Sequence, residues 1–225
     1  MWMECRRVGQ EYRGVSYRAA ALAGGLLVAA CAGKGELDSS GGITAVRSAC
    51  PTVGVAAGTG DVTLFDPPSS RDASAIDLTA VMTNVRSTCA DAGDQIVTAV
   101  TFDVEARRTR TDAARDVELP YYSAVVRGGS AVVAKRIGRV RLHFDAGQAR
   151  AQVAGTAQTS VTRTAATLPP DIRKQLTRKR KAGEEDAAID PLTQPDVRAA
   201  VLRVSFEALV GFQLTDEQLR YNATR

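Results

Sequence analysis

The chain has 225 residues, 44% hydrophobic and 24% charged, so it can form one large domain and is not globally disordered. A single histidine and four cysteines leave little material for transition-metal sites or histidine-based catalysis. No apolar run reaches the ~18–20 residues that a membrane-spanning helix needs. The formal net charge is +4, but without the four arginines and two glutamates of the leader described below, 25 basic and 23 acidic residues remain. This near-neutral balance does not indicate nucleic-acid binding.

Residues 1–30 are predicted to be a secretory signal peptide. Arg13 and Arg18 precede an apolar stretch, residues 19–30, that ends in small side chains before Cys31. As a helix this stretch would extend only ~18 Å, well short of a ~30 Å hydrocarbon core. Two interpretations of residues 1–14 stay open: they belong to the leader, or they precede a true start at Val15 read from a GTG codon.

The end of the leader, Leu27-Val28-Ala29-Ala30-Cys31, resembles the lipobox of bacterial lipoproteins, with Val28 where leucine is commoner. The resemblance implies that the Cys31 thiol carries a diacylglyceryl group, that the leader is cut before Cys31, and that the new amine is acylated. It also implies that Ala32, in place of aspartate, favours the outer membrane, facing the periplasm. Residues 31–45, rich in glycine and serine, are then a lipidated tether. The alternative is an ordinary secreted protein in which Cys31 is one more thiol.

Cys50 and Cys89 are the cysteines that remain for a disulfide. Cys5 leaves with the leader and Cys31 takes the lipid, so an even pair stays in a compartment where disulfides persist. A bridge would close a loop of about 40 residues and stabilise the fold by about 3–4.7 kcal/mol on the chain-entropy account. The alternative is two free buried thiols. Catalysis by either has little support, because the only histidine is His143.

Residues 46–167 are predicted to form an antiparallel β domain, because apolar and polar residues alternate with the period of strands that have one wet face. The expected strands cover residues 76–83, 96–105, 117–127, 130–137, 139–145 and 148–163. Turn signals separate them, among them Gly128-Gly129. So many short strands in about 100 residues predict a mainly β (α+β) fold, an immunoglobulin- or fibronectin-like sandwich followed by helices.

Residues 168–225 are predicted to be a helical segment packed on the sandwich. A helix is expected at 171–182, and a second at 196–210, where apolar residues recur every three or four positions before Gly211. A terminal helix is expected to begin at Thr215, whose hydroxyl forms a capping box with Gln218.

Candidate catalytic chemistry is sparse. His143 alternates with core residues, so we expect it on the solvent-facing side of its strand; the alternative, a general base, lacks an accompanying nucleophile motif. The sequence contains no glycine-rich phosphate loop, no metal-ligand spacing and no calcium-binding loop. We therefore expect no enzymatic activity, no metal and no cofactor.

A basic run is the most conspicuous surface feature. Its six positive side chains are Arg173, Lys174, Arg178, Lys179, Arg180 and Lys181. The run suits binding to anionic lipid phosphates or acidic envelope polymers. The alternative is a solvated helix whose charge is balanced by the acidic residues at 184–186.

By combining a lipobox, a β-rich body and an arginine-rich helix, the chain resembles uncharacterised envelope lipoproteins of alphaproteobacteria, and its ending at residues 212–222 is similar to theirs. The resemblance implies a location and no activity. We expect a non-catalytic envelope lipoprotein that binds an envelope protein partner in assembly or scaffolding. Two alternatives are binding of an acidic polymer or anionic lipid through residues 173–181 and, third, a hydrolase around His143. A nucleic-acid partner is not expected.

Overall fold

The computed structural model describes residues 48–178 and 189–224. The elements in chain order are β1 (Thr52–Val55), β2 (Asp61–Phe65), η1 (Ala73–Ala75), β3 (Ile76–Ala92), β4 (Gln95–Arg108), β5 (Arg115–Arg127), β6 (Ala131–Phe144), β7 (Arg150–Thr162), α1 (Pro170–Thr177), η2 (Pro191–Thr193), α2 (Pro195–Val204), β8 (Phe206–Phe212) and α3 (Asp216–Thr224).

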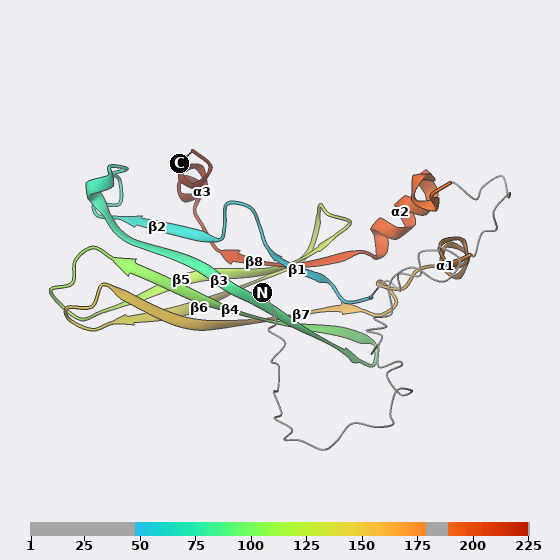
Figure 1. Cartoon of the computed structure of the whole chain (residues 1–225), viewed down its shortest axis with the longest axis horizontal. Coiled ribbons are helices and arrows are strands. Elements are labelled where there is room, and N and C mark those ends of the chain that lie inside the picture. Colours follow the sequence, from blue (N-terminus) through green and yellow to red (C-terminus); the bar gives the residue numbers. More distant parts are fainter. Residues whose placement is uncertain (1–47, 179–188, 225) are drawn as a thin grey trace, which may run out of the picture.

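Two four-stranded sheets form an elongated sandwich (Figure 1). The first sheet has the order β1-β8-β5-β6 and the second the order β2-β3-β4-β7. β1 and β8 pair in parallel, which places the first and last strands side by side, whereas the other pairs are antiparallel. In Figure 1, α1 and α2 lie at one end of the sandwich, and β2 and α3 lie toward the other.

The predicted fold class is confirmed at the level of a mainly β, two-sheet body with C-terminal helices. The immunoglobulin- or fibronectin-like strand order is not confirmed. In the immunoglobulin order, the second and third strands belong to different sheets. Here β2, β3 and β4 are successive neighbours in one sheet.

The core lies between the sheets, where the period-two pattern places alternate side chains. Phe102 from the second sheet and Phe144 and Phe212 from the first are its largest fully buried side chains. A second apolar cluster, around Val125 and Phe206, packs against the two cysteines. A third, formed by α1 and α2, contains Ile172 and Val197. Small clusters therefore extend the main core toward the helical end.

The predicted helix at 196–210 is wrong in its second half. α2 ends at Val204, and Phe206–Phe212 forms strand β8 within the segment that we expected to be helical. Phe206, Ala208, Val210 and Phe212 are all buried at a spacing of two. The strand is favoured because its backbone pairs with β1 on one side and with β5 on the other. A helix in this position would leave the backbone groups of β1 and β5 that face it without hydrogen-bond partners.

The other predicted helices are close to those observed. α1 covers Pro170–Thr177 and ends before Arg178, whose backbone is extended, so the predicted helix at 171–182 is wrong at residue 178; residues from 179 on lie outside the described residues. The capping box before α3 is confirmed: the Gln218 amide donates to Thr215 Oγ1 at 3.2 Å, and the Thr215 amide donates to Gln218 Oε1 at 2.9 Å. The Gly128-Gly129 turn is also confirmed, because both glycines have positive φ, 62° and 79°, between β5 and β6.

Candidate functional site

A disulfide joins Cys50 and Cys89, with the two Cα atoms 6.0 Å apart. Cys50 precedes β1 in the first sheet, and Cys89 lies near the end of β3 in the second, so the bridge ties the two sheets together. Both cysteines pack against the apolar cluster around Val125 and Phe206. The predicted pairing is confirmed. Cys31, the predicted lipidation site, lies outside the described residues.

Part of the predicted basic run can be located. Arg173 and Lys174 lie on α1 and Arg178 follows it, and all three are exposed. Ile172 faces the other way, into the cluster with Val197 of α2, so packing turns the cations outward. Lys179, Arg180 and Lys181 lie outside the part of the chain that the structure describes.

His143 lies on the exposed face of β6, as predicted, between two carboxylates. Its Nδ1 is 2.7 Å from Oδ1 of Asp116, its cross-strand partner on β5, and its Nε2 is 3.3 Å from Oδ1 of Asp145. The hydrogen bond to Asp116 is the main cause that raises the pKa of His143 above its usual 6.5. Both ring nitrogens face carboxylates, and this arrangement favours the protonated imidazole.

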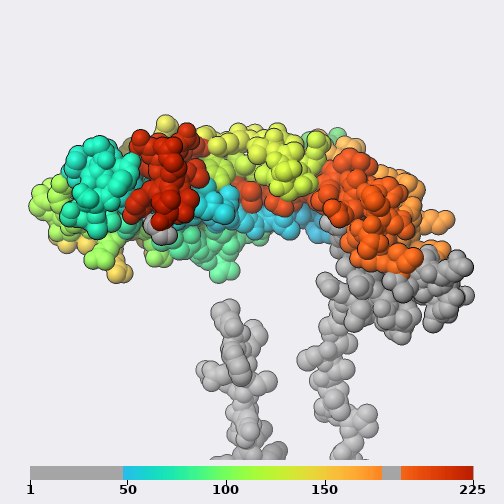
Figure 2. Space-filling model, turned by 90° about the horizontal axis from the view of Figure 1, so that it is seen from above, coloured from blue at the N-terminus to red at the C-terminus, as the bar shows by residue number. Residues whose placement is uncertain are grey.

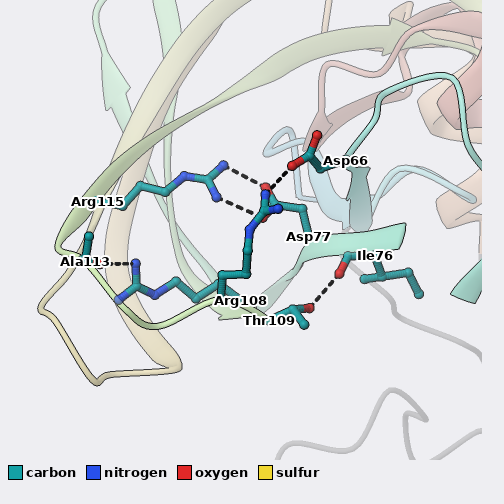
Figure 3. Close-up of polar contacts among 8 residues, drawn as sticks. Asp66, Ile76, Asp77, Arg108, Thr109, Ala113 and Arg115 are labelled. Carbon is teal, nitrogen blue, oxygen red and sulfur yellow. Dashed lines mark hydrogen bonds and ion pairs between the residues drawn. The ribbon is translucent and has the colours of Figure 1, made fainter. Parts of the chain in front are cut away.

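An ion cluster that no sequence pattern indicated lies at the end of the sandwich where β2 and β3 meet (Figure 3). Asp77, expected on a wet face, is only 7% exposed. Its carboxylate accepts two hydrogen bonds from Arg115, at 2.9 and 2.7 Å, and a longer one of 3.4 Å from Arg110, which also pairs with Asp66. The Arg115 hydrogen bond, more than any other contact, lowers the pKa of Asp77. No local sequence signal marked the cluster, because Arg110 and Arg115 are more than thirty positions from Asp77.

Arg108 in the same region is buried, and its guanidinium hydrogen-bonds to the protein backbone. Its guanidinium donates to the carbonyl oxygens of Gln148, Ala113 and Asp145 at 2.7–2.8 Å and lies over the Phe144 ring. It therefore joins the loop after β4 to the loop after β6, and its charge faces carbonyl groups rather than an open site.

A shallow groove of about 750 Å³ crosses the second sheet from β2 to β7. Val62, Ala80 and Ala106 face the core here, so their neighbours along each strand project into the groove. The projecting residues are Asp61, Thr63, Thr79, Val81, Glu105, Arg107, Arg150 and Gln152. Two acidic residues and two arginines give the groove no net charge. Its lining does not favour one class of ligand.

Strand β6 is one of the two edge strands of the first sheet and is strongly exposed along its first half. Within residues 48–178 and 189–224 it pairs with β5 alone, and every residue from 131 to 137 is exposed. Three of these are large apolar side chains, Val132, Val133 and Ile137. No helix in the described ranges is long and apolar enough to span a membrane, and no group of three or more His, Cys, Asp or Glu in these ranges is placed to hold a metal ion.

The chain was compared with known protein families, curated proteins and solved structures. No family model, no curated protein and no solved structure matches the chain.

Proposed function

We propose that the protein is a non-catalytic, lipid-anchored envelope protein whose β domain serves as a protein-interaction or scaffolding module in the periplasm. The observation that carries the location is the Cys50–Cys89 disulfide, close behind the lipobox in the sequence. Structural disulfides persist in oxidising compartments, and a bacterial lipoprotein leader delivers its protein to one. The same bridge holds the two sheets at the point where the described chain begins.

The interaction role is supported by how the polar side chains are used. His143 is held between two carboxylates, Asp77 is paired with Arg115, and Arg108 faces carbonyl oxygens. These groups stabilise the fold instead of converging on one reactive point. Strand β6, by contrast, has exposed apolar side chains and lies at an edge of its sheet. Both are features of protein-binding surfaces.

The anchor is tested by replacing Cys31 in the full chain. Wild-type protein is expected at the mature size in the outer-membrane fraction, labelled by a clickable fatty acid. Cys31→Ala is expected to be unlabelled and either uncleaved or soluble, because no thiol is available to carry the lipid. A Cys31→Ala protein that still fractionates with membranes at the mature size would overturn the anchor.

The interaction role is tested by crosslinking in native membranes. One defined protein adduct, with peptides from the domain in the crosslinked product, is expected for the wild-type chain. If the protein is instead crosslinked to many envelope proteins, each in proportion to its abundance, the interaction role is overturned.

A second candidate, binding of anionic lipid or acidic polymer through residues 173–181, is favoured by the placement of α1. It lies at the same end of the sandwich as α2 and the disulfide-linked start of the domain (Figure 1). A tether attached at that end would hold the cations near the membrane, where each adds up to about 1 kcal/mol of attraction.

This candidate is tested on mature chain with Cys31→Ser, which carries no lipid, in vesicle flotation at low and high salt. Wild-type sequence should float with anionic vesicles at low salt, and Arg178→Gln/Lys179→Gln/Arg180→Gln should not. Equal flotation of both proteins, or none at low salt, would exclude the basic run as the binding element.

A further inference from the structure

Among the described residues, no strand pairs with the outer edge of β6 along its first half. This strand is the last in the order β1-β8-β5-β6, and its register with β5 runs from Ala131 to Phe144. Near Gly138 the strand approaches β7, since its partner Tyr121 donates to the Thr156 carbonyl at 2.6 Å. Before Gly138, residues 131–137 are exposed on both faces of the strand. The backbone groups that point away from β5 are thus open to another chain.

The side chains of this edge combine apolar surface with one sign of charge. Val132 is 63% exposed, Ile137 56% and Val133 47%. The strand contains Lys135, Arg136, Arg139 and Arg141, and no acidic residue. Glu118 of β5 pairs with Arg139 and Arg141, whereas Lys135 lies over the Tyr122 ring. The exposed half therefore presents positive charge between apolar side chains.

The neighbouring elements leave this edge accessible. Figure 2 shows the yellow-green hairpin between β5 and β6 on the surface beside orange α2, away from red α3. The hairpin is held there by its turn, where the Gly128 amide donates to the Ser205 carbonyl at 3.0 Å. A rigid edge loses little conformational entropy when a partner strand is added.

We propose that residues 131–137 of β6 bind an extended, acidic segment of a partner protein as an additional strand of the first sheet. Backbone hydrogen bonds supply affinity, carboxylates facing Lys135 and Arg136 supply specificity, and Val132 and Ile137 contact apolar residues of the segment. The proposal deepens the interaction role proposed above and depends on it.

Two other occupants fit the edge less well. A second copy of β6 would bring like cations together across the new pair, which is unfavourable. An anionic membrane would neutralise the cations, but its headgroups would not form a strand ladder along the open edge.

The proposal is tested by hydrogen exchange of the mature chain with Cys31→Ser. The probe is a short peptide in which pairs of glutamates alternate with pairs of valines, so that both faces of the added strand present carboxylates, and the control probe has lysine in place of glutamate. Addition of the acidic probe should slow amide exchange at residues 131–137 and leave β1, at the opposite edge of the same sheet, unchanged. The lysine probe should have no effect.

Charge reversal supplies the matched comparison. Lys135→Glu/Arg136→Glu should weaken binding of the acidic probe about tenfold or more. Arg107→Glu/Arg150→Glu, which reverses two exposed, cross-strand arginines on the other sheet, should leave binding unchanged. Thermal melts should show that both variants remain folded.

Four results would overturn the proposal. They are no protection at 131–137 at low salt, equal probe binding by both double variants, protection by anionic vesicles without the probe, and protection that rises with protein concentration alone. The last two would identify a lipid surface and a second copy. None of them affects the Cys31 result or a protein crosslinked elsewhere, so failure of this proposal is distinct from failure of the proposed function.

Discussion

Asp77 on β3 and Arg115 at the start of β5 form a two-point ion pair between the two sheets. Arg115 Nη1 and Nη2 donate to the two carboxylate oxygens of Asp77 at 2.9 and 2.7 Å (Figure 3). Asp77 is nearly buried whereas Arg115 is partly exposed, so the aspartate depends on the pair more than the arginine does. The contact closes the end of the sandwich opposite the disulfide.

Asp77→Asn is expected to lower the free energy of unfolding by about 1.5–3 kcal/mol at neutral pH, because it removes a charged hydrogen-bond partner. The folded pKa of Asp77 lies below its usual 3.8, so this stabilisation is present above that pH and is lost as the pH falls through the folded value. Urea denaturation across pH measures both effects. Glu217→Gln, which removes the exposed pair with Arg71, is the control and should cost about 0–1 kcal/mol. Equal losses in the two variants would contradict the assigned role.

Removal of the disulfide by Cys50→Ser/Cys89→Ser is expected to cost about 3–4.7 kcal/mol, because the unfolded chain regains the freedom of the long closed loop. Denaturant unfolding of the oxidised wild type and of the variant measures the difference. Alkylation followed by mass spectrometry gives an independent check. Both cysteines should stay unlabelled in native protein until a reductant is added, and labelling before reduction would reject the bridge.

Gly155→Ala is expected to destabilise the protein by about 1–3 kcal/mol through overpacking. A Cβ at Gly155 would lie 2.3 Å from Cε2 of Phe102, whose ring is fully buried. Gly54→Ala is the matched strand control, since its Cβ would meet only Leu209 Cδ2 at 4.0 Å. Thermal melts of both variants measure the difference. A Gly155→Ala protein as stable as Gly54→Ala would show that the core can move there.

The pKa of His143 is expected to lie above 6.5, because the hydrogen bond to Asp116, with a smaller contribution from Asp145, favours the protonated ring. The stabilisation from this arrangement is fully present below pH 6.5 and is lost as the pH rises through the folded pKa. Proton NMR of the imidazole ring measures this without ambiguity, since the chain has one histidine. Asp116→Asn should lower the pKa more than Asp145→Asn does, because the Asp116 hydrogen bond is the larger cause. A wild-type value at or below 6.5 would contradict the geometry.

Much of the β body was predictable from the sequence, because strand periodicity is a local property. Alternation between residues 96 and 105 predicted which side chains of β4 face the core, and Phe102 and Val104 are buried there. The capping box of Thr215 and Gln218 and the Gly128-Gly129 turn were predictable for the same reason: each is made by residues next to one another in the chain. The disulfide pairing followed from counting cysteines, on the expectation that Cys5 leaves with the leader and Cys31 carries the lipid.

Other features depended on contacts between distant segments. Residues 206–212 form a strand because β1 and β5 lie on either side of them, although the three-and-four spacing before them favoured a helix. Asp77 is buried because Arg110 and Arg115, more than thirty positions along the chain, reach it from the loop after β4 and the start of β5. The sequence predicted two strands, 130–137 and 139–145, where the structure has the single strand β6. Only the tertiary structure decided that this strand lies at an edge of its sheet, because strand order depends on pairing between distant segments, and no local pattern encodes it.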